Sequence, residues 1–338
     1  MERDVAALAA LRRDDEAATA AWLAERLPGA VVEEFDGRST YAWANAAIAA
    51  AGLAARPLWA RAALIVALEG DASGRLALPV PRRKGANVVF RVPASKEKRR
   101  TLVLMAHHDT QKAGLVWAPA LQKPGAARRL KTRSIPPYLA PTALALALRA
   151  RPLLWLWLAL SVEQAVRGPV PGANDNATGV AAVLALAERY AAEPFEDTEV
   201  VAALVGNEES GMAGSCAFFA RHAFDPATTL VLSLDTLGCG TPIVLEAEHA
   251  LLRHRYAAED LALVPPDVQR WTIGGWTDAL QAKFAGLRAL SLLSIGPEGA
   301  FTHYHHASDL PEHVDFASVR ACVEVAERTI AAWATPGR

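Results

Sequence analysis

The sequence has few of the features that mark exported, disulfide-stabilised or polyanion-binding proteins. Its 338 residues contain only three cysteines, Cys216, Cys239 and Cys322, with no Cys-x-x-Cys spacing. A disulfide framework is therefore excluded, and a reducing compartment is favoured. The formal net charge of −1 gives no reason to expect a nucleic acid as partner. The charged start of the chain, residues 1–4, lacks the apolar core of a signal peptide. We expect a cytoplasmic protein.

A long uninterrupted apolar run is also missing. The most apolar stretch, from Tyr138 to Val162, carries Arg149 and Arg151 near its centre and is divided by Pro152. Each part has about ten apolar residues, too few to cross a hydrocarbon core of about 30 Å. We therefore predict a helical hairpin with Arg149–Pro152 at its tip.

This hairpin lies in a predicted insertion, residues 111–170, that also contains a basic stretch at 128–133. Three roles are open: a lid over a site, a homodimerisation surface, or a peripheral membrane contact assisted by the basic stretch. Packing against the body of the protein or a second subunit is the simplest arrangement. The predicted location is thus cytoplasmic, with peripheral membrane attachment as an alternative.

The sequence does contain a change of pattern near residue 86. Residues 2–27 and 40–68 are rich in Ala, Leu and Trp and predict helices, so that 1–85 forms an N-terminal helical segment packing on the rest. From residue 86, short apolar runs alternate with helical stretches. This predicts an α/β fold, a mixed, largely parallel central sheet flanked by helices on both faces. The predicted strands are 87–92, 101–106, 199–205, 229–234, 243–245 and 289–294, and the predicted helices of this part are 177–190, 211–222, 278–285 and 316–333.

Five acidic or histidine motifs follow apolar runs at points where a turn begins. Each alone has a simple structural explanation, such as a polar loop, a helix N-cap or a complement to a helix dipole. Four of the five fall beyond predicted strand ends, where ligands bind in parallel sheets. Together they supply His and carboxylate ligands that suit zinc. The motifs are His107-His108-Asp109, Asn174-Asp175-Asn176, Glu208-Glu209, Asp235 and His305.

Local geometry separates some of these residues by role. Side chains at i and i+2 of a strand share a face, so His107 and Asp109 point together and His108 points away. His107 is then the ligand, and Asp109 orients it through the second ring nitrogen. Adjacent carboxylates at 208 and 209 allow one to bind metal while the other works as general base. A carboxylate such as Asp175 can bridge two cations.

These motifs, in this order, resemble those of the co-catalytic di-zinc aminopeptidases, whose relatives include bacterial leucyl aminopeptidases, the glutamate carboxypeptidase II group and the glutaminyl cyclases. The resemblance covers residues 86–334. It implies a zinc-exopeptidase catalytic domain at 86–338, two Zn²⁺ ions and a peptide or small-amide substrate. It also implies a cis peptide bond after Asp175.

The resemblance further implies a role for each matching residue. His305 is chosen among three nearby histidines because Tyr304 precedes it and Asp309 follows it by four residues, as in the family. His303 and His306 are bystanders. The implied catalytic residues are Glu208 as general base, Tyr304 as a donor to the oxyanion and Asp109 as the orienting carboxylate. The implied metal ligands are His107, Asp175 as the bridge, Glu209, Asp235 and His305.

The implied reaction is hydrolysis of a peptide amide bond, at the N-terminus by default, by a hydroxide held between two zinc ions. Two alternatives stay open. A glutaminyl cyclase-like acyltransferase would use one zinc ion, and a membrane-associated amidohydrolase would share the fold. Trp271, Trp276 and Phe301 lie near strand ends and either line a substrate pocket or belong to the core, which is commoner for large aromatics.

Overall fold

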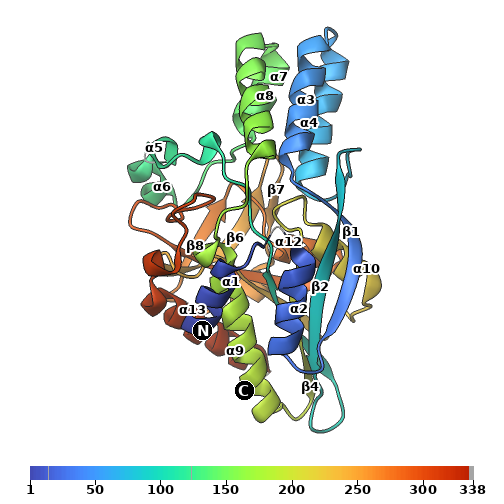
Figure 1. The fold of residues 1–338 in the computed structure, drawn as a ribbon. Helices are drawn as coiled ribbons and strands as arrows, with labels where there is room; N and C mark the ends of the chain where they lie inside the picture. Colours follow the sequence, from blue (N-terminus) through green and yellow to red (C-terminus); the bar gives the residue numbers. More distant parts are fainter. Residues whose placement is uncertain (14, 123, 335–338) are drawn as a thin grey trace.

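A single mixed sheet forms the centre of the molecule. The computed structural model describes residues 1–13, 15–122 and 124–334, and Figure 1 traces this part of the chain. Nine strands pair within it. They are β1 (Val31–Arg38), β2 (Arg82–Val92), β3 (Arg100–His107), β4 (Thr198–Val205), β5 (Thr229–Leu234), β6 (Thr241–His249), β7 (Arg253–Arg255), β8 (Gln269–Ile273) and β9 (Arg288–Ile295).

The order of the strands is β1-β2-β4-β3-β5-β9-β6-β7, with β8 paired to β6. The four central strands, β4, β3, β5 and β9, are parallel. Strands β1 and β2 run antiparallel to their neighbours, whereas β6 is antiparallel to β9 and β7 but parallel to β8. All six predicted strands are present, and the predicted fold class is confirmed. The short strands β7 and β8 were not predicted.

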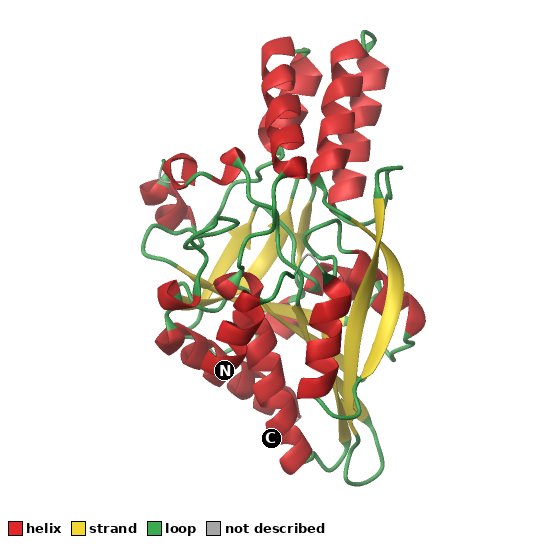
Figure 2. Cartoon of the chain, in the orientation of Figure 1, coloured by secondary structure: helices red, strands yellow, loops and turns green. Residues whose placement is uncertain are grey.

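Helices cover both faces of this sheet, as Figure 2 shows. On one face, α2, α9 and α13 pack on the strands, with α1 packed against α9, and on the other face lie α10, α11 and α12. Helices α3, α4, α7 and α8 stand apart. The bounds are α1 (Glu2–Ala10), α2 (Glu16–Arg26), α3 (Ala42–Ala54), α4 (Leu58–Ala72), α5 (Pro119–Gln122), α6 (Ala126–Thr132), α7 (Ala140–Leu148), α8 (Arg151–Val166), α9 (Thr178–Ala192), α10 (Ala213–Arg221), α11 (Ala258–Leu261), α12 (Ala279–Phe284) and α13 (Phe316–Ala334).

The central strands are apolar along their whole length because both of their faces are covered. In β3, every residue from Thr101 to His107 is buried, and β5 is buried throughout. Such continuous burial is typical of parallel strands between two helical layers. The register pairs His107 with Val205, so β3 and β4 end together. Polar residues that follow these strands are thereby brought to one edge of the sheet.

The N-terminal segment is not wholly helical, which corrects the sequence prediction. Its strand β1 pairs antiparallel with β2 at the edge of the sheet. The strand alternates, with Glu33 and Phe35 buried and Glu34 and Asp36 exposed. Three acidic residues within a short alternating run hid this strand, because charged residues are uncommon in strands.

Helices α3, α4, α7 and α8 form a bundle that projects from the body beyond the strand ends (Figures 1 and 2). Helices α7 and α8 occupy the predicted hairpin region, with Arg149 and Ala150 between them, and pack on α3 and α4. Gly52 of α3 permits this contact, because a Cβ there would lie 2.4 Å from Leu146 Cδ2. Among the described residues, no helix is long and apolar enough to span a membrane.

The basic stretch at 128–133 does not form one exposed patch, and it lies on α6, away from the bundle (Figure 1). Arg129 is buried and donates hydrogen bonds to the carbonyl oxygens of Pro124, Glu298 and Gly299. This arginine ties α6 to the segment that leads into His305. The expectation that the stretch assists the hairpin at a membrane is therefore not supported by its position.

One buried carboxylate of the sheet predicts a pH-dependent stability. Glu248 of β6 is fully buried, and burial raises its pKa to about 7, although Tyr256 and Thr277 donate hydrogen bonds to it. The folded chain therefore keeps a proton that the unfolded chain releases around the ordinary glutamate pKa of 4.5. This reduces the free energy of unfolding as pH rises from about 4.5 to 7, by on the order of 3 kcal/mol.

Glu248→Gln should remove this dependence, since a neutral amide cannot ionise. Urea unfolding between pH 5 and pH 8 should show the variant gaining stability relative to wild type as pH rises. A constant difference across this range would show that Glu248 does not take up a proton on folding.

Candidate metal centre

The five predicted ligands come together at the carboxyl edge of the sheet. His107 is the last residue of β3, Asp235 follows β5 directly, and Glu209 lies in the loop after β4. Asp175 belongs to a short turn, η2 (Ala173–Ala177), before α9, and His305 lies in the loop after β9. All five side chains are buried. Segments far apart in the sequence thus meet because parallel strands place their ends at one edge.

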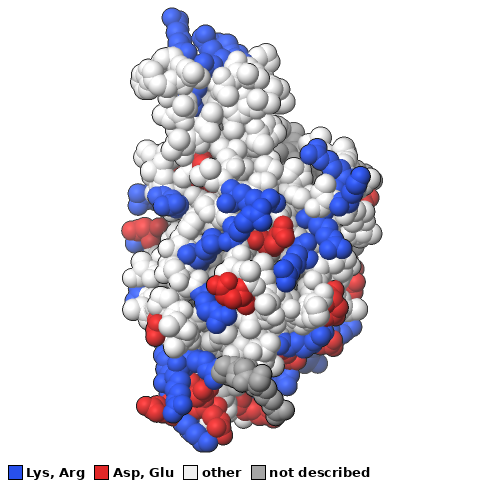
Figure 3. Space-filling view, turned by 180° about the vertical axis from the view of Figure 1, so that it is seen from behind, with Lys and Arg blue, Asp and Glu red and all other residues white. Residues whose placement is uncertain are grey.

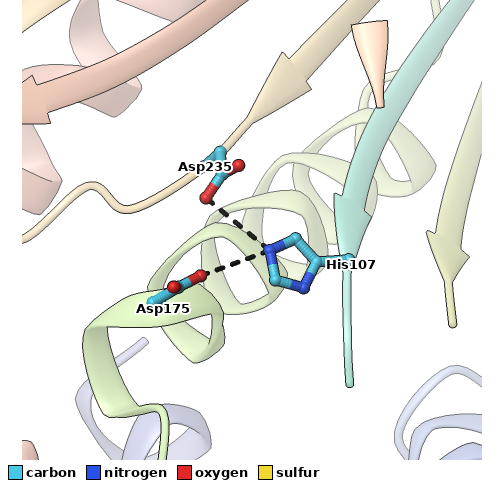
Figure 4. A group of neighbouring side chains, drawn as sticks. All are labelled: His107, Asp175 and Asp235. Atoms are coloured by element: carbon cyan, nitrogen blue, oxygen red, sulfur yellow. Dashed lines mark ion pairs between the residues drawn. The ribbon is translucent and has the colours of Figure 1, made fainter. Parts of the chain in front are cut away.

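Three of these residues form a first group that could hold a metal ion. The Nε2 atom of His107 lies 3.3 Å from Asp175 Oδ1 and 3.7 Å from Asp235 Oδ1. Figure 4 shows both carboxylates pointing toward the same ring nitrogen. One imidazole and two carboxylates make a ligand set that suits zinc.

A second group shares Asp175 with the first. Its other oxygen, Oδ2, lies 3.1 Å from His305 Nε2, and Glu209 Oε1 also lies 3.1 Å from that nitrogen. The candidate ligand atoms of this group lie within 4.8 Å of one another. Asp175 therefore stands between the two groups, with one oxygen facing each.

The donor atoms of the second group fit a cation on chemical grounds. Asp175 Oδ2, Glu209 Oε1 and His305 Nε2 are buried without a hydrogen-bond partner among the described residues. Buried polar atoms are nearly always hydrogen-bonded, because an unsatisfied one costs free energy. Three such atoms converging on one point form a group that could hold a cation.

The pKa shifts of the two histidines reflect this concentration of negative charge. Burial lowers the pKa of the His305 imidazole, but Glu209 and Asp175 outweigh burial and raise it to about 9. For His107, the surrounding carboxylates, Glu208 foremost, likewise outweigh burial and raise the pKa well above its ordinary value. Several carboxylate side chains of the protein thus lie together at this point, and a metal cation would neutralise their negative charge.

Asp109 lies where the sequence analysis expected the orienting carboxylate. Its Oδ1 atom lies 3.5 Å from Nδ1 of His107, the ring nitrogen on the far side from Asp175. Its two oxygens also accept hydrogen bonds from the backbone N–H groups of Glu208 and Glu209, each at 3.1 Å. Asp109 therefore fixes the loop that carries both glutamates as well as facing His107.

Each side chain of the Asn174-Asp175-Asn176 motif has a separate task. Asn176 Oδ1 accepts from the backbone N–H of Gly179 in the first turn of α9, so one member does act as the helix cap. Asn174 Oδ1 accepts from the backbone N–H of Gly238, in the loop after β5. Asp175 is left to face the metal groups. The Asp175–Asn176 peptide bond is cis, as predicted.

The neighbouring histidines point elsewhere. His108 Nε2 lies 2.7 Å from the carbonyl oxygen of Ala86 on β2, and His303 and His306 both contact the hydroxyl of Ser308. Tyr304 stacks on His305 with ring centroids 3.7 Å apart. Burial raises the pKa of the Tyr304 phenol well above its ordinary value, so it is a hydrogen-bond donor at neutral pH.

A cavity of about 760 Å³ opens onto the metal groups. Glu208, half-buried, lies in its wall beside Glu209. Burial raises the pKa of the Glu208 carboxyl well above its ordinary range, and the charges of Glu209 and Asp278 add to this against His107. Trp276 and Phe301 line the cavity, whereas Trp271 is buried in the core and does not.

Two residues that support the site were not found from the sequence. Gln111 Nε2 donates to Glu209 Oε2 at 2.9 Å and to the Glu209 carbonyl oxygen at 3.2 Å. Its position two residues after Asp109 was the only available signal. Arg13, from the N-terminal segment, is buried and donates to the carbonyl oxygens of Pro171 and Gly172. Nothing in its local sequence distinguishes it from a surface arginine.

Arg13 lies below the turn that carries Asp175. Burial lowers the pKa of its guanidinium to about 10, while the nearby charges of Asp309 and Asp175 oppose that shift. Asp309 accepts the backbone N–H groups of Asn174 and Asp175, at 2.8 and 3.0 Å. Gly172 has a φ of 61°, and a Cβ there would lie 2.2 Å from Arg13 Nη2. Only glycine allows this approach.

The arrangement defines the class: a mixed, mostly parallel sheet with paired His and carboxylate groups beyond its strand ends is a fold of the zinc-exopeptidase type. The sequence profile of Peptidase family M28 matches residues 157–330. The chain belongs to this family, which confirms the resemblance stated from its motifs. The match begins within α8, so His107 and Asp109 lie outside it.

Solved structures share the fold at low sequence identity. A Zn-dependent exopeptidase from Parabacteroides distasonis superposes with a TM-score of 0.55 at 13% identity, over 100% of this chain and 98% of that one. The glutaminyl cyclase of Porphyromonas gingivalis gives 0.52 at 12%, over 98% of both chains. The aminopeptidase of Aneurinibacillus sp. strain AM-1 gives 0.50 at 18%, over 76% of this chain and 50% of that one. The chain thus spans about half the length of the Aneurinibacillus aminopeptidase. A search of curated proteins finds no match.

The hydrogen bond from Gln111 predicts a measurable effect on metal binding. Gln111→Met keeps the side-chain length but removes the donor that orients Glu209, so zinc affinity should fall by about 10- to 100-fold. Competition with a fluorescent chelator would measure this, with Gln269→Met, which lies outside the cavity lining, as control. Equal zinc affinity in Gln111→Met and wild type would show that this hydrogen bond does not position a ligand.

Proposed function

We propose that the protein is a zinc-dependent exopeptidase that removes residues from the N-terminus of a peptide or small amide. The observation that carries this proposal is the pair of ligand groups sharing Asp175, with Glu208 beside them in the cavity wall. Membership in Peptidase family M28 supports it.

The residues present fit two ions. One would be held by His107 and Asp235, the other by Glu209 and His305, with Asp175 as the shared ligand. When bound, two zinc ions would supply positive charge that polarises an amide carbonyl and lowers the pKa of water, so that water can lose a proton and attack that carbonyl. The unpartnered buried atoms of the second group are the independent support for an ion there.

Glu208 is the proposed general base. It lies in the cavity wall next to the proposed ligand Glu209. Its backbone N–H donates a hydrogen bond to Asp109, which fixes its position, and its carboxylate is not one of the proposed metal ligands. It would take a proton from the attacking water and deliver it to the leaving amine. Tyr304 lines the same cavity and is proposed to donate to the oxygen that becomes negative in the transition state.

The cavity also indicates the substrate. Its lining is mainly apolar away from the metal groups, with Ile135, Ile273, Trp276 and Phe301 among the wall residues. Apolar walls bind apolar side chains by removing their surface from water. We therefore propose a substrate whose terminal residue is hydrophobic, and we place its amide bond at the Glu208 side of the cavity.

Replacing the base separates its role from metal binding. Glu208→Gln should lower kcat by about 10²- to 10⁴-fold, because a neutral amide cannot accept the proton. Metal analysis should still find two zinc ions per chain in the variant. Turnover close to wild type would remove Glu208 from the base role, whereas lost zinc would make it a ligand instead.

A substrate screen tests the reaction itself. The full chain, loaded with zinc, should hydrolyse leucyl amides and dipeptides faster than glutamyl or glycyl ones, and a chelator should abolish the activity. N-terminally acetylated peptides serve as the control for terminus recognition. Cyclisation of N-terminal glutamine with one bound zinc would instead support a glutaminyl cyclase-like reaction, and no activity on any amide with both metals bound would refute the proposal.

A further inference from the structure

The outer surface of the projecting bundle is unusually apolar for a surface facing water. Trp59 is 75% exposed and Leu148 69% exposed. The bundle carries most of the large apolar side chains that are exposed in the described part of the chain. Its exposed members outside the cavity lining are Leu58, Trp59, Val66, Leu148, Leu153, Trp155, Leu156, Val162 and Val166. Exposed apolar patches of this kind mark interaction surfaces.

The part of the bundle away from the body carries charge of one sign. Residues 40–68 and 138–162, which form nearly all of it, contain no aspartate or glutamate. They contain four arginines instead, at 56, 61, 149 and 151. The acidic residues of these helices, such as Glu69, Asp71 and Glu163, lie closer to the body of the protein, beyond those two ranges.

All four arginines lie near the far end of the bundle. The α3–α4 turn and the α7–α8 turn meet there, because Arg61 donates to the carbonyl oxygen of Ala147 and Arg151 to that of Leu53. Figure 3 shows blue side chains at this end and a white surface beneath them. A cationic tip therefore stands above apolar sides.

We propose that the bundle docks, tip first, on an anionic lipid surface. Arginines at the tip would pair with lipid phosphates, while the tryptophans and leucines next to them enter the region between headgroups and acyl chains. Each basic residue close to an anionic membrane adds electrostatic attraction, and Trp is favoured at the interface. The far end of the bundle has both the basic residues and the exposed tryptophans that such binding needs.

Charge argues against a second copy of the chain as the occupant. A dimer formed through these tips would bring arginines of both copies together, and residues 40–68 and 138–162 offer no carboxylate to pair with them. Like charges brought together in an interface oppose association. The tip is also remote from the metal groups: α8 has 16 residues and is therefore about 24 Å long.

Docking through the tip would fix the distance of the cavity from the membrane surface. Residues at the base of the bundle, Tyr41, Asn45 and Tyr138, contribute to the cavity lining. The metal groups would then stay in water, below the membrane surface by about the length of the bundle. The proposal concerns the bundle alone and does not depend on the reaction at the metal centre.

Vesicle flotation tests the proposal with the full chain. Wild type should float with vesicles of 70% phosphatidylcholine and 30% phosphatidylglycerol, and much less with pure phosphatidylcholine. The double variant Arg56→Gln/Arg149→Asn removes two charges but keeps the hydrogen bonds of Arg61 and Arg151. Its partitioning should be weaker by at least about tenfold. Asparagine is chosen at 149 because that residue has a φ of 54°.

The double variant Trp59→Ser/Trp155→Ser tests the apolar contribution to membrane binding. It should reduce the vesicle binding that remains in 0.5 M salt, where electrostatic attraction is screened. The control for charge is Arg320→Gln/Arg328→Gln, which removes two exposed arginines of α13, far from the bundle. The control for apolar surface is Leu252→Ser, which removes an exposed leucine outside the bundle. These controls should bind like wild type. Thermal unfolding should show every variant folded.

Three results would overturn the proposal. Wild type that stays at the bottom of the gradient with anionic vesicles is not a membrane binder. Equal binding to pure phosphatidylcholine would remove the charge-based recognition. Light scattering that finds a dimer, dissociated by Trp59→Ser/Trp155→Ser and without vesicle binding, would assign the surface to a second copy of the chain.

Discussion

Buried negative charge at one edge of the sheet is the constraint on which the site depends. Four carboxylates, from Asp109, Asp175, Glu209 and Asp235, are held there with two imidazoles and little access to water. Burying ionised groups is costly unless each finds a partner. The fold provides partners in two ways: backbone N–H groups and hydroxyls satisfy one set of oxygens, and the remaining oxygens converge on points where a cation fits. Asp175 is a member of both candidate ligand groups, so its position determines how the two groups lie relative to each other.

The hydrogen bonds around Asp175 explain why its turn is so heavily constrained. Asp309 holds the backbone N–H of Asp175, Arg13 holds the carbonyl of Gly172, and Asn174 and Asn176 bond to the loop and strand end near Asp235. The turn is thus attached to segments from both ends of the chain. A ligand that faces two ions must not rotate, and this framework restricts it.

The central strands and the metal-facing residues that follow them could be predicted from the sequence, because they depend on hydrophobic periodicity and on the place of a polar residue after an apolar run. Buried strands appear as apolar runs, and a polar residue immediately after such a run, as at His107 or Asp235, lies at the strand end whatever the tertiary details. Gln111 and Arg13 could not be found in this way, because their function comes from partners 98 and 158 or more residues away. The strand β1 was missed because its charged residues resemble those of a loop. The surroundings of the hairpin could not be predicted either, since the partner helices α3 and α4 precede it by about 70 residues or more.

The matched family region and the folding unit are not the same. The family profile covers residues 157–330, yet β3 lies between β4 and β5 in the middle of the sheet. A fragment limited to the matched region would lack β1, β2 and β3, leaving β4 and β5 without the strand that joins them, and would also lack His107. The N-terminal segment adds Glu16, which accepts a hydrogen bond from Asn207 directly before the two glutamates. The first half of the chain therefore supplies internal strands of the same sheet, and a boundary drawn where sequence similarity begins would divide that sheet in two.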